Sequence, residues 1–245
     1  MPIYKVRPHA ESYGHDIGIL LIDCRTPFIP GDVGNATSYR YPVLYRTVPD
    51  VTLDRLINRG DLSLTGNVLA TARGLEAVGV RAITSDCGYM LHFQKQVAAA
   101  VSIPVMLSPL LQLPFVESLL GDDAAIGIIC ANRQRLTPDL LAIALPNPRL
   151  PVHVAGLETC PNFRGPILDE TDTLDSDAIE AEVVAAASQL CDAHPAIGAI
   201  VMECSNLPPY AHAVQAATGR PVFDFLTMID HVRAATRRRR YAGHY

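Results

Sequence analysis

The 245-residue sequence has no tryptophan, few charged residues and no long hydrophobic run. Charged residues make up 18% of the chain and hydrophobic residues 49%, whereas average soluble domains are roughly 25% charged. So apolar a chain can bury enough surface to offset its ordering entropy, which excludes intrinsic disorder. The longest apolar runs, such as 17–22 and 124–131, fall far short of the roughly 20 residues that a membrane-spanning helix needs. We therefore expect no membrane partner.

The charge balance disfavours another class of partner. Twenty Lys and Arg residues stand against 25 Asp and Glu, a formal net charge of −5 at pH 7. Nucleic-acid-binding domains need a basic surface, so no nucleic-acid partner is predicted. The four arginines at 237–240 are interpreted as a solvated end of the chain, with binding of nucleic acid or another acidic partner as the alternative. The polar first nine residues lack the apolar segment of a secretion signal, which predicts a cytoplasmic protein.

Cysteine and histidine are present, but not in paired spacing. The six cysteines include no Cys-x-x-Cys, and the eight histidines include no His-x-x-x-His. Disulfide frameworks and structural zinc sites depend on such spacing, so neither a disulfide framework nor a metal site is predicted. In a reducing cytosol, each cysteine then serves either packing or chemistry.

Short β-branched runs alternate with longer stretches rich in alanine and leucine. Strands are predicted at 16–23, 43–48, 81–85, 104–107, 124–130, 151–155, 196–203 and 221–223. Helices are predicted at 66–78, 91–100, 109–119, 138–145, 176–193, 208–218 and 225–237. Pro161 and Pro166 are interpreted as marking loops. This alternation predicts an α/β fold of mainly parallel sheets flanked by helices.

The chain also repeats itself. Residues 82–88 (AITSDCG) resemble 199–205 (AIVMECS), 117 residues later, and 17–20 (IGIL) resemble 126–129 (IGII), 109 residues later. Both offsets are near half the chain length, which indicates two pseudo-symmetric lobes. We expect one lobe over 1–119 plus 209–245, carrying Cys87, and the other over 120–208, carrying Cys204.

Cys87 and Cys204 each follow the carboxyl end of a predicted strand and precede a helix. Ligands bind at that edge of open α/β sheets, and a helix N-terminus stabilises a thiolate. Gly88 and Ser205, the next residues, are small enough to let a substrate approach the backbone. Two thiols that face each other across a cleft suit inversion of a carbon centre: one thiolate removes a proton and the opposite thiol returns one. The remaining cysteines are interpreted as packing residues: Cys24, Cys130, Cys160 and Cys191.

The segments 84–89 (TSDCGY) and 203–208 (ECSNLP) resemble the aspartate/glutamate (hydantoin) racemase superfamily of cofactor-independent, two-cysteine racemases. The resemblance implies two α/β lobes with the active site in the cleft between them. It implies that Cys87 and Cys204 are the acid/base groups, that no pyridoxal phosphate or other cofactor is needed, and that a homodimer is possible. By position, Asp23 matches a catalytic acid that helps the first cysteine.

The sequence departs from glutamate racemases at three places. Asn206 stands where a histidine is usual, Glu203 replaces the usual glycine, and the loop at 25–35 lacks the Asp-Ser-Gly pattern. These departures disfavour a cell-wall glutamate racemase and favour a relative of the aspartate, hydantoin or other amino-acid-derivative racemases. Whether Asp23, Asp86 or Glu203 tunes the thiols stays open.

Polar residues near the two cysteine segments are candidates for binding a carboxylate substrate. Arg25 lies in a long loop rich in proline and glycine, where it would clamp a carboxylate or simply be a surface arginine. Ser205 and Asn206 would hold the carboxylate by hydrogen bonds, cap the following helix, or do both. The predicted substrate-binding residues are Arg25, Ser85, Gly88, Tyr89, Ser205 and Asn206.

The sequence therefore predicts a racemase or epimerase of an amino acid or amino-acid derivative, working on a small carboxylate substrate. Three alternatives stay open. A decarboxylase or cis–trans isomerase of a small dicarboxylic acid would need one cysteine only. A cysteine-dependent hydrolase is weakly indicated by 21–24 (LIDC), which resemble isochorismatase-like hydrolases, but it leaves the second cysteine segment unexplained. A non-catalytic small-molecule-binding protein would keep the same scaffold.

Overall fold

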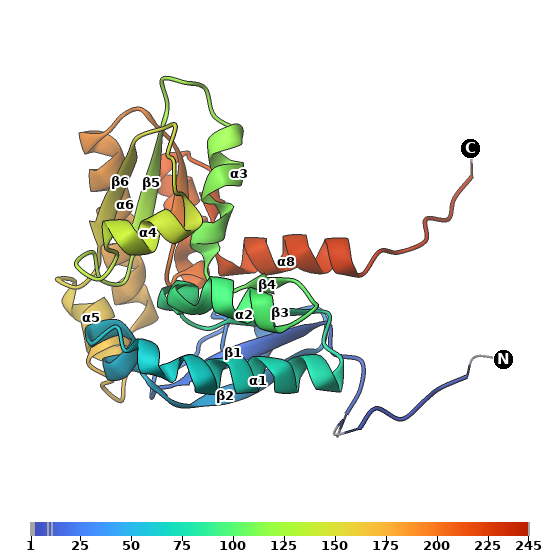
Figure 1. Cartoon of the computed structure of the whole chain (residues 1–245). Coiled ribbons are helices and arrows are strands. Elements are labelled where there is room, and N and C mark those ends of the chain that lie inside the picture. The colour runs from blue at the N-terminus through green and yellow to red at the C-terminus, as the bar shows by residue number, and fades with distance from the viewer. Residues whose placement is uncertain (1–2, 9, 11, 245) are drawn as a thin grey trace.

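Two four-stranded parallel sheets form two lobes in the computed structural model, which describes residues 3–8, 10 and 12–244 (Figure 1). The first sheet has the strand order β2 (Val43–Thr52), β1 (Ile17–Asp23), β3 (Ala82–Ser85) and β4 (Val105–Met106). The second has the order β6 (Val152–Gly156), β5 (Ala125–Cys130), β7 (Ile197–Met202) and β8 (Val222–Phe223). The predicted fold class is confirmed, although residues 1–2, 9, 11 and 245 of the predicted first lobe lie outside the described residues.

The two sheets share one topology and one register. Ile17 pairs with Val43 and Ala82 in the first sheet. Ile126 pairs with Val152 and Ala199 in the second. These equivalent positions include the starts of both sequence echoes, so the repeated segments occupy equivalent places in the two sheets.

Helices flank both sheets, and several begin with a short 3-10 turn. The α-helices are α1 (Thr65–Val78), α2 (Gln94–Ala100), α3 (Leu113–Ser118), α4 (Pro138–Ala144), α5 (Pro161–Leu168), α6 (Ser176–Ala193), α7 (Ala211–Thr218) and α8 (Phe225–Thr236). The 3-10 helices span Ala36–Ser38, Leu62–Leu64, Gly88–Phe93, Pro109–Gln112 and Pro208–Tyr210, and a π-helix spans Asp54–Asn58. Helix α6 has the predicted bounds, because the Asp175 side chain accepts a hydrogen bond from the Ala178 N–H and one apolar stripe is buried. None of the helices in the described part of the chain combines the length and the apolar character that crossing a bilayer requires.

Helix α5 corrects the interpretation of Pro161 and Pro166 as loop markers. Pro161 occupies the first turn of this helix, where its missing N–H would have no helical partner. The Glu182 side chain accepts hydrogen bonds from the backbone N–H groups of Asn162 and Phe163, and Phe163 is fully buried. Capping by a distant residue and tertiary packing therefore stabilise a helix that contains Pro166.

The chain crosses between the lobes at two neighbouring points. It passes from β4 to β5 through α3, and it returns after β8 into α8, whose Phe225, Met228 and Ile229 pack under the first sheet. Strand β8 pairs with β7 in the second sheet, although residues 209–245 were predicted to belong with the first lobe. The predicted division of the chain into lobes stays a prediction. The Gln112 side chain donates to the Asp224 backbone carbonyl over 2.9 Å and so joins the two crossings.

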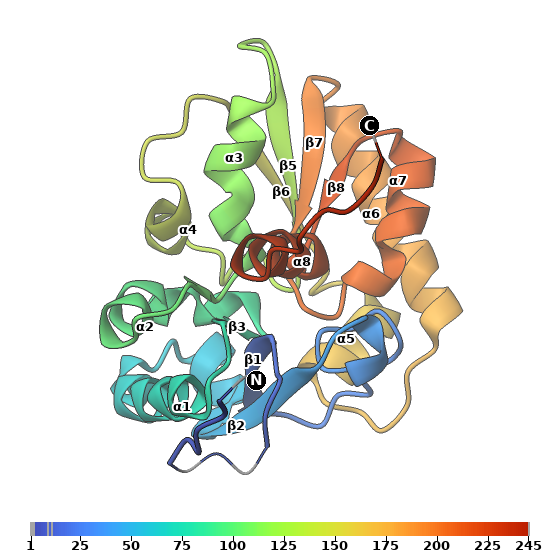
Figure 2. The same ribbon diagram turned by 90° about the vertical axis from the view of Figure 1, so that its right-hand side faces the viewer.

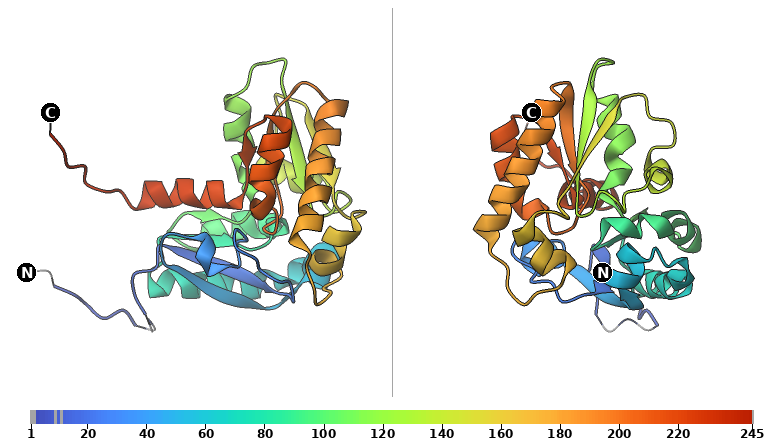
Figure 3. Two further views of the ribbon diagram at one scale, coloured as in Figure 1. Left: turned by 180° about the vertical axis from the view of Figure 1, so that it is seen from behind. Right: turned by 90° about the vertical axis from the view of Figure 1, so that its left-hand side faces the viewer.

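Helix α8 occupies the space between the lobes on one side of the molecule, where Figure 2 views it end-on. The described residues 3–8 and 237–244 both extend away from this side, as Figure 3 shows. Arginines 238–240 are exposed in the C-terminal segment, whereas Arg237 contacts the buried Asp16 carboxylate. This placement agrees with a solvated C-terminal end.

Candidate active site

Cys87 and Cys204 line one pocket between the lobes. Cys87 follows β3 and Cys204 follows β7, at equivalent places in the repeated topology. Their side chains are 7% and 8% exposed, and both are free thiols. Four other predicted residues line the same pocket: Gly88, Tyr89, Ser205 and Asn206. The fold thus brings together the two cysteine segments that lie far apart in the sequence.

The pocket is narrow and walled by apolar side chains. Its volume is about 30 Å³. Roughly 10–15 Å³ of such space holds one water molecule. Seven apolar residues from both lobes contribute to the wall: Ile22, Phe28, Leu53, Ile57, Ala131, Ile167 and Leu168. Sequence reasoning missed this wall, because Leu53 and Ile57 belong to the π-helix region and the last two belong to the unpredicted helix α5.

Direct contacts hold the cysteine segments against each other. The Ser205 hydroxyl donates to the backbone carbonyl of Asp86. The Tyr89 hydroxyl donates to the Asn132 carbonyl over 2.7 Å and accepts from the Asn132 N–H over 3.1 Å. A Cβ atom on Gly88 would lie only 2.1 Å from Glu203 Oε1 and 2.4 Å from the Glu203 carbonyl oxygen. Glycine is therefore needed at position 88 for the lobes to approach this closely.

The acid that precedes each cysteine is buried in the pocket. Glu203 is 1% exposed and Asp86 is 4% exposed. Glu203 Oε2 accepts from the Ala131 N–H and Asp86 Oδ1 accepts from the Ile22 N–H. Within the described part of the chain, Glu203 Oε1 and Asp86 Oδ2 have no hydrogen-bond partner. Burial raises the pKa of each carboxyl group to about 8, so both are mostly protonated at neutral pH.

The two thiols are also held in their neutral form. Burial, and then the charge of Glu203, raises the pKa of both Cys87 and Cys204 well above the usual value for a thiol. The Cys204 thiol donates to Asn206 Oδ1 over 3.4 Å, and Asn206 Nδ2 donates to Asp32 Oδ2 over 2.6 Å. Asp32 was not among the predicted site residues, and burial raises its pKa to about 7. A nearby positive charge would favour the thiolate form in this pocket.

Three other predicted residues lie outside the pocket lining. Asp23 and Arg25 are exposed at the end of β1 and just beyond it. The backbone N–H of Arg25, rather than its guanidinium, donates to Glu170 of the second lobe over 2.8 Å. The buried Ser85 hydroxyl bonds to the backbone carbonyls of Cys87 and Leu107, so it shapes the turn that carries the first cysteine.

The charge character of the pocket favours a cation. The described residues that line it include two buried acids and no lysine, arginine or histidine. Within the part of the chain that the structure describes, no group of three or more His, Cys, Asp or Glu residues is arranged to hold a metal ion. The pocket therefore suits acid/base chemistry on a small molecule that carries a positive charge of its own.

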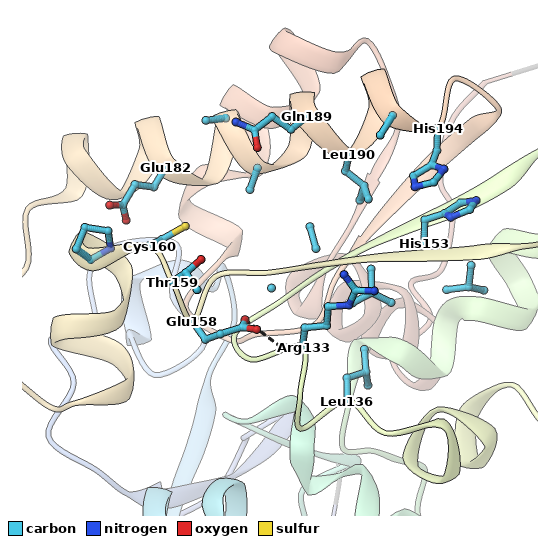
Figure 4. Close-up of a pocket in the computed structure, with 18 residues that line it drawn as sticks. Arg133, Leu136, His153, Glu158, Thr159, Cys160, Glu182, Gln189, Leu190 and His194 are labelled. Carbon is cyan, nitrogen blue, oxygen red and sulfur yellow. Dashed lines mark hydrogen bonds between the residues drawn. The ribbon is translucent and has the colours of Figure 1, made fainter.

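A larger hollow lies beside β6 and α6, away from the cysteine pair (Figure 4). Its volume is about 800 Å³, and the stacked rings of His153 and His194, with centroids 3.6 Å apart, form one end. Arg133 and Glu158 line its base, where the Arg133 N–H donates to the Glu158 carboxylate. It contains none of the predicted site residues.

Comparison with known proteins gives relatives of one kind. No family model matches the sequence. The chain is 34% identical over 221 residues to a dimethylsulfoniopropionate lyase from Durusdinium sp. clade D, covering 87% of this chain and 72% of that protein. It is 33% identical over 230 residues to dimethylsulfoniopropionate lyase 3 of Emiliania huxleyi (strain CCMP1516), covering 89% of this chain and 59% of the relative.

Solved structures share the fold at low sequence identity. Allantoin racemase from Pseudomonas fluorescens superposes with a TM-score of 0.60 at 16% identity, covering 89% of each chain. An aspartate racemase homologue from Pyrococcus horikoshii gives 0.56 at 14% identity, covering 90% of this chain and 98% of that one. Unliganded arylmalonate decarboxylase gives 0.55 at 14% identity, covering 89% and 92%. The chain therefore shares the fold of an allantoin racemase, an aspartate racemase homologue and arylmalonate decarboxylase, the two-lobed α/β fold that the resemblance of the cysteine segments implied.

Proposed function

This chain belongs to the dimethylsulfoniopropionate lyase family, and from this premise we propose that it is a lyase that cleaves dimethylsulfoniopropionate or a close sulfonium analogue. The observation that carries the proposal is the pocket between the lobes, where two thiols meet two buried acids and no basic side chain. A dicarboxylate substrate would add negative charge to these acids. A sulfonium substrate brings the positive charge that they lack.

The substrate has a carboxylate next to its α-carbon and a dimethylsulfonium group on its β-carbon. Elimination begins when a thiolate takes a proton from the α-carbon. The electron pair of the broken C–H bond forms the carbon–carbon double bond, and the β-carbon–sulfur bond breaks with its electron pair leaving on sulfur. The products are acrylate and neutral dimethyl sulfide, and the thiol then returns its proton to water. The reaction needs a single base.

Cys204 is the base in this proposal. Its hydrogen bond to Asn206, which Asp32 holds in turn, fixes the direction of the sulfur. A sulfonium ion beside the buried sulfur favours the thiolate and so opposes the burial that raises the pKa of Cys204. The substrate thereby helps to ionise the base that attacks it, and the apolar wall keeps water away from the developing charge.

A second candidate is the racemase or epimerase that the sequence predicts. It is favoured by one observation: Cys87 and Cys204 come from opposite lobes and line the same pocket. Proton removal beside a carboxylate is common to both candidates. They differ in the number of thiols required, because elimination needs one base whereas inversion needs an acid and a base on opposite faces.

The deciding experiment incubates the purified protein with dimethylsulfoniopropionate and measures dimethyl sulfide by headspace gas chromatography. We expect Cys204→Ser to lower kcat by a factor on the order of 100 or more, as removal of a general base does. Cys87→Ser should keep a larger fraction of activity. Cys191→Ser, on α6 outside the pocket, is the matched control.

Two outcomes would overturn the lyase proposal. One is the absence of dimethyl sulfide with the wild-type protein. The other is full activity in Cys204→Ser. Incorporation of solvent deuterium into aspartate, glutamate or hydantoins, lost equally in both cysteine variants, would support the racemase instead.

A further inference from the structure

Glu203 occupies a special place in the repeated architecture. It ends the strand segment before Cys204, yet its carboxylate reaches across the lobe boundary to lie against Gly88, beside Cys87. Its charge is the largest electrostatic influence on both thiols. The Glu203 carboxylate lines the same pocket as both thiols and lies against the residue that follows Cys87.

One oxygen of this carboxylate has no partner. Oε2 accepts from the Ala131 N–H, whereas Oε1 is fully buried and has no hydrogen bond within the described residues. A buried charge without a partner is strongly unfavourable, and the pocket lining supplies no basic side chain. A cationic ligand would complete this arrangement.

We propose that Glu203 determines specificity by pairing its carboxylate with the positively charged sulfur of the substrate. The choice of a sulfonium ligand rests on the proposed function. The pairing itself is a binding property that can be measured without turnover. Glu203 stands where the racemase resemblance leads us to expect glycine, so this lobe carries an acidic side chain in place of a bare backbone.

Asp86, the equivalent acid of the first lobe, is less suited to this role. It also has an unpartnered oxygen, but its charge acts on Cys24 and Cys87. Its Oδ1 atom is held by the Ile22 N–H of the first sheet over 2.9 Å. Asp86 thus lies on the first-lobe side of the pocket, and Asp86→Asn is the matched control for the loss of one buried carboxyl group.

The test uses two ligands of equal shape that differ in charge. One is 3-(trimethylammonio)propionate, a zwitterion with a positively charged onium group and a stable carbon–nitrogen bond, and the other is 4,4-dimethylpentanoate, its isostere with an uncharged tert-butyl group in place of the onium group. Isothermal titration calorimetry at pH 8 gives both dissociation constants. We expect the wild-type protein to bind 3-(trimethylammonio)propionate at least about tenfold more tightly than 4,4-dimethylpentanoate, because a close buried charge pair strengthens binding. In Glu203→Gln the ratio should fall to about one, whereas Asp86→Asn should keep most of it.

A second measurement uses the wild-type protein alone. Titrations at pH 7 in buffers of different ionisation enthalpy report the protons released on binding. An onium group favours the ionised form of a buried acid beside it, and Glu203 is mostly protonated before binding, so 3-(trimethylammonio)propionate should release a proton whereas 4,4-dimethylpentanoate should release none. This result does not depend on whether the variant folds.

Several outcomes would overturn the inference: wild-type protein that binds neither ligand, wild-type protein that binds both equally, or Glu203→Gln that keeps the wild-type ratio. A ratio lost in Asp86→Asn and kept in Glu203→Gln would assign the cation to the other acid. None of these results depends on dimethyl sulfide release. A protein that prefers the cation but forms no dimethyl sulfide would support the Glu203 site and refute the proposed lyase.

Discussion

Replacing Glu203 by glutamine should change how the stability of the fold depends on pH. Glutamine keeps the size of the side chain and an acceptor for the Ala131 N–H, but it cannot ionise. In the unfolded chain the Glu203 carboxyl has its usual pKa of 4.5, whereas burial raises the pKa to about 8 in the folded protein. Between these two values the folded state holds a proton that the unfolded state has released.

The sign and size of the effect follow from this difference. Stability falls with rising pH wherever the folded state binds more protons, at about 1.4 kcal/mol per pH unit for one group. The contribution of Glu203 is fully present below pH 4.5 and is lost progressively up to about pH 8. From pH 5.5 to 7.5, wild-type protein should lose roughly 2–3 kcal/mol of unfolding free energy that Glu203→Gln retains.

The assay is urea unfolding at pH 5.5, 6.5 and 7.5, followed by circular dichroism because the chain has no tryptophan. The quantity compared is the difference in unfolding free energy between variant and wild type at each pH, which cancels the titration of other groups. Glu180→Gln, which removes an exposed carboxylate on α6, should track the wild type. A constant difference between Glu203→Gln and wild type across this range would refute the buried, protonated state of Glu203.

Two further predictions concern the contact between the lobes. Gly88→Ala places a methyl group against the Glu203 carboxylate and its backbone carbonyl, and the backbone cannot move aside as a flexible side chain would. We expect a loss of about 1–3 kcal/mol in unfolding free energy, together with reduced dimethyl sulfide release, and wild-type values in both assays would contradict this contact. Tyr89→Phe removes a hydroxyl that bonds both backbone groups of Asn132, so urea unfolding should show a loss of about 1–2 kcal/mol. An unchanged midpoint would mean that water replaces the hydroxyl without loss.

The strands and the positions of Cys87 and Cys204 at their ends can be predicted from the sequence. Buried parallel strands are continuous apolar runs, and the repeat places Cys87 and Cys204 after equivalent strands. The direction of the side chains at the end of β1 could not be predicted from the sequence. The pairing of β1 with β2 shifts register between Leu21 and Asp23, and such an irregularity re-aims the residues beyond it. Asp23 consequently faces solvent. No pattern in the sequence predicts this direction.

The charge preference of the pocket also could not be predicted from the sequence. Arg25 suggested a clamp for an anion, but its side chain is exposed and the pocket lining has no basic group. The sequence showed only that Glu203 replaces the glycine that the resemblance leads us to expect. Its role in the pocket depends on the position of its carboxylate, which crosses to Gly88 in the opposite lobe. Helix α5 was missed because its stability comes from Glu182, about 20 residues away, rather than from local sequence.

The two chain crossings that Gln112 joins have a mechanical consequence. A cavity that holds two or three water molecules must widen before the proposed substrate can enter it. The chain joins the lobes through α3 between β4 and β5, and α8, which follows β8, packs against the first sheet. A rotation of one lobe about these two adjacent segments would widen the cavity. Such a rotation would break the hydrogen bond between the Arg25 N–H and Glu170 and move Cys87 away from Cys204, so we expect the reaction to begin only after the lobes have closed on the substrate.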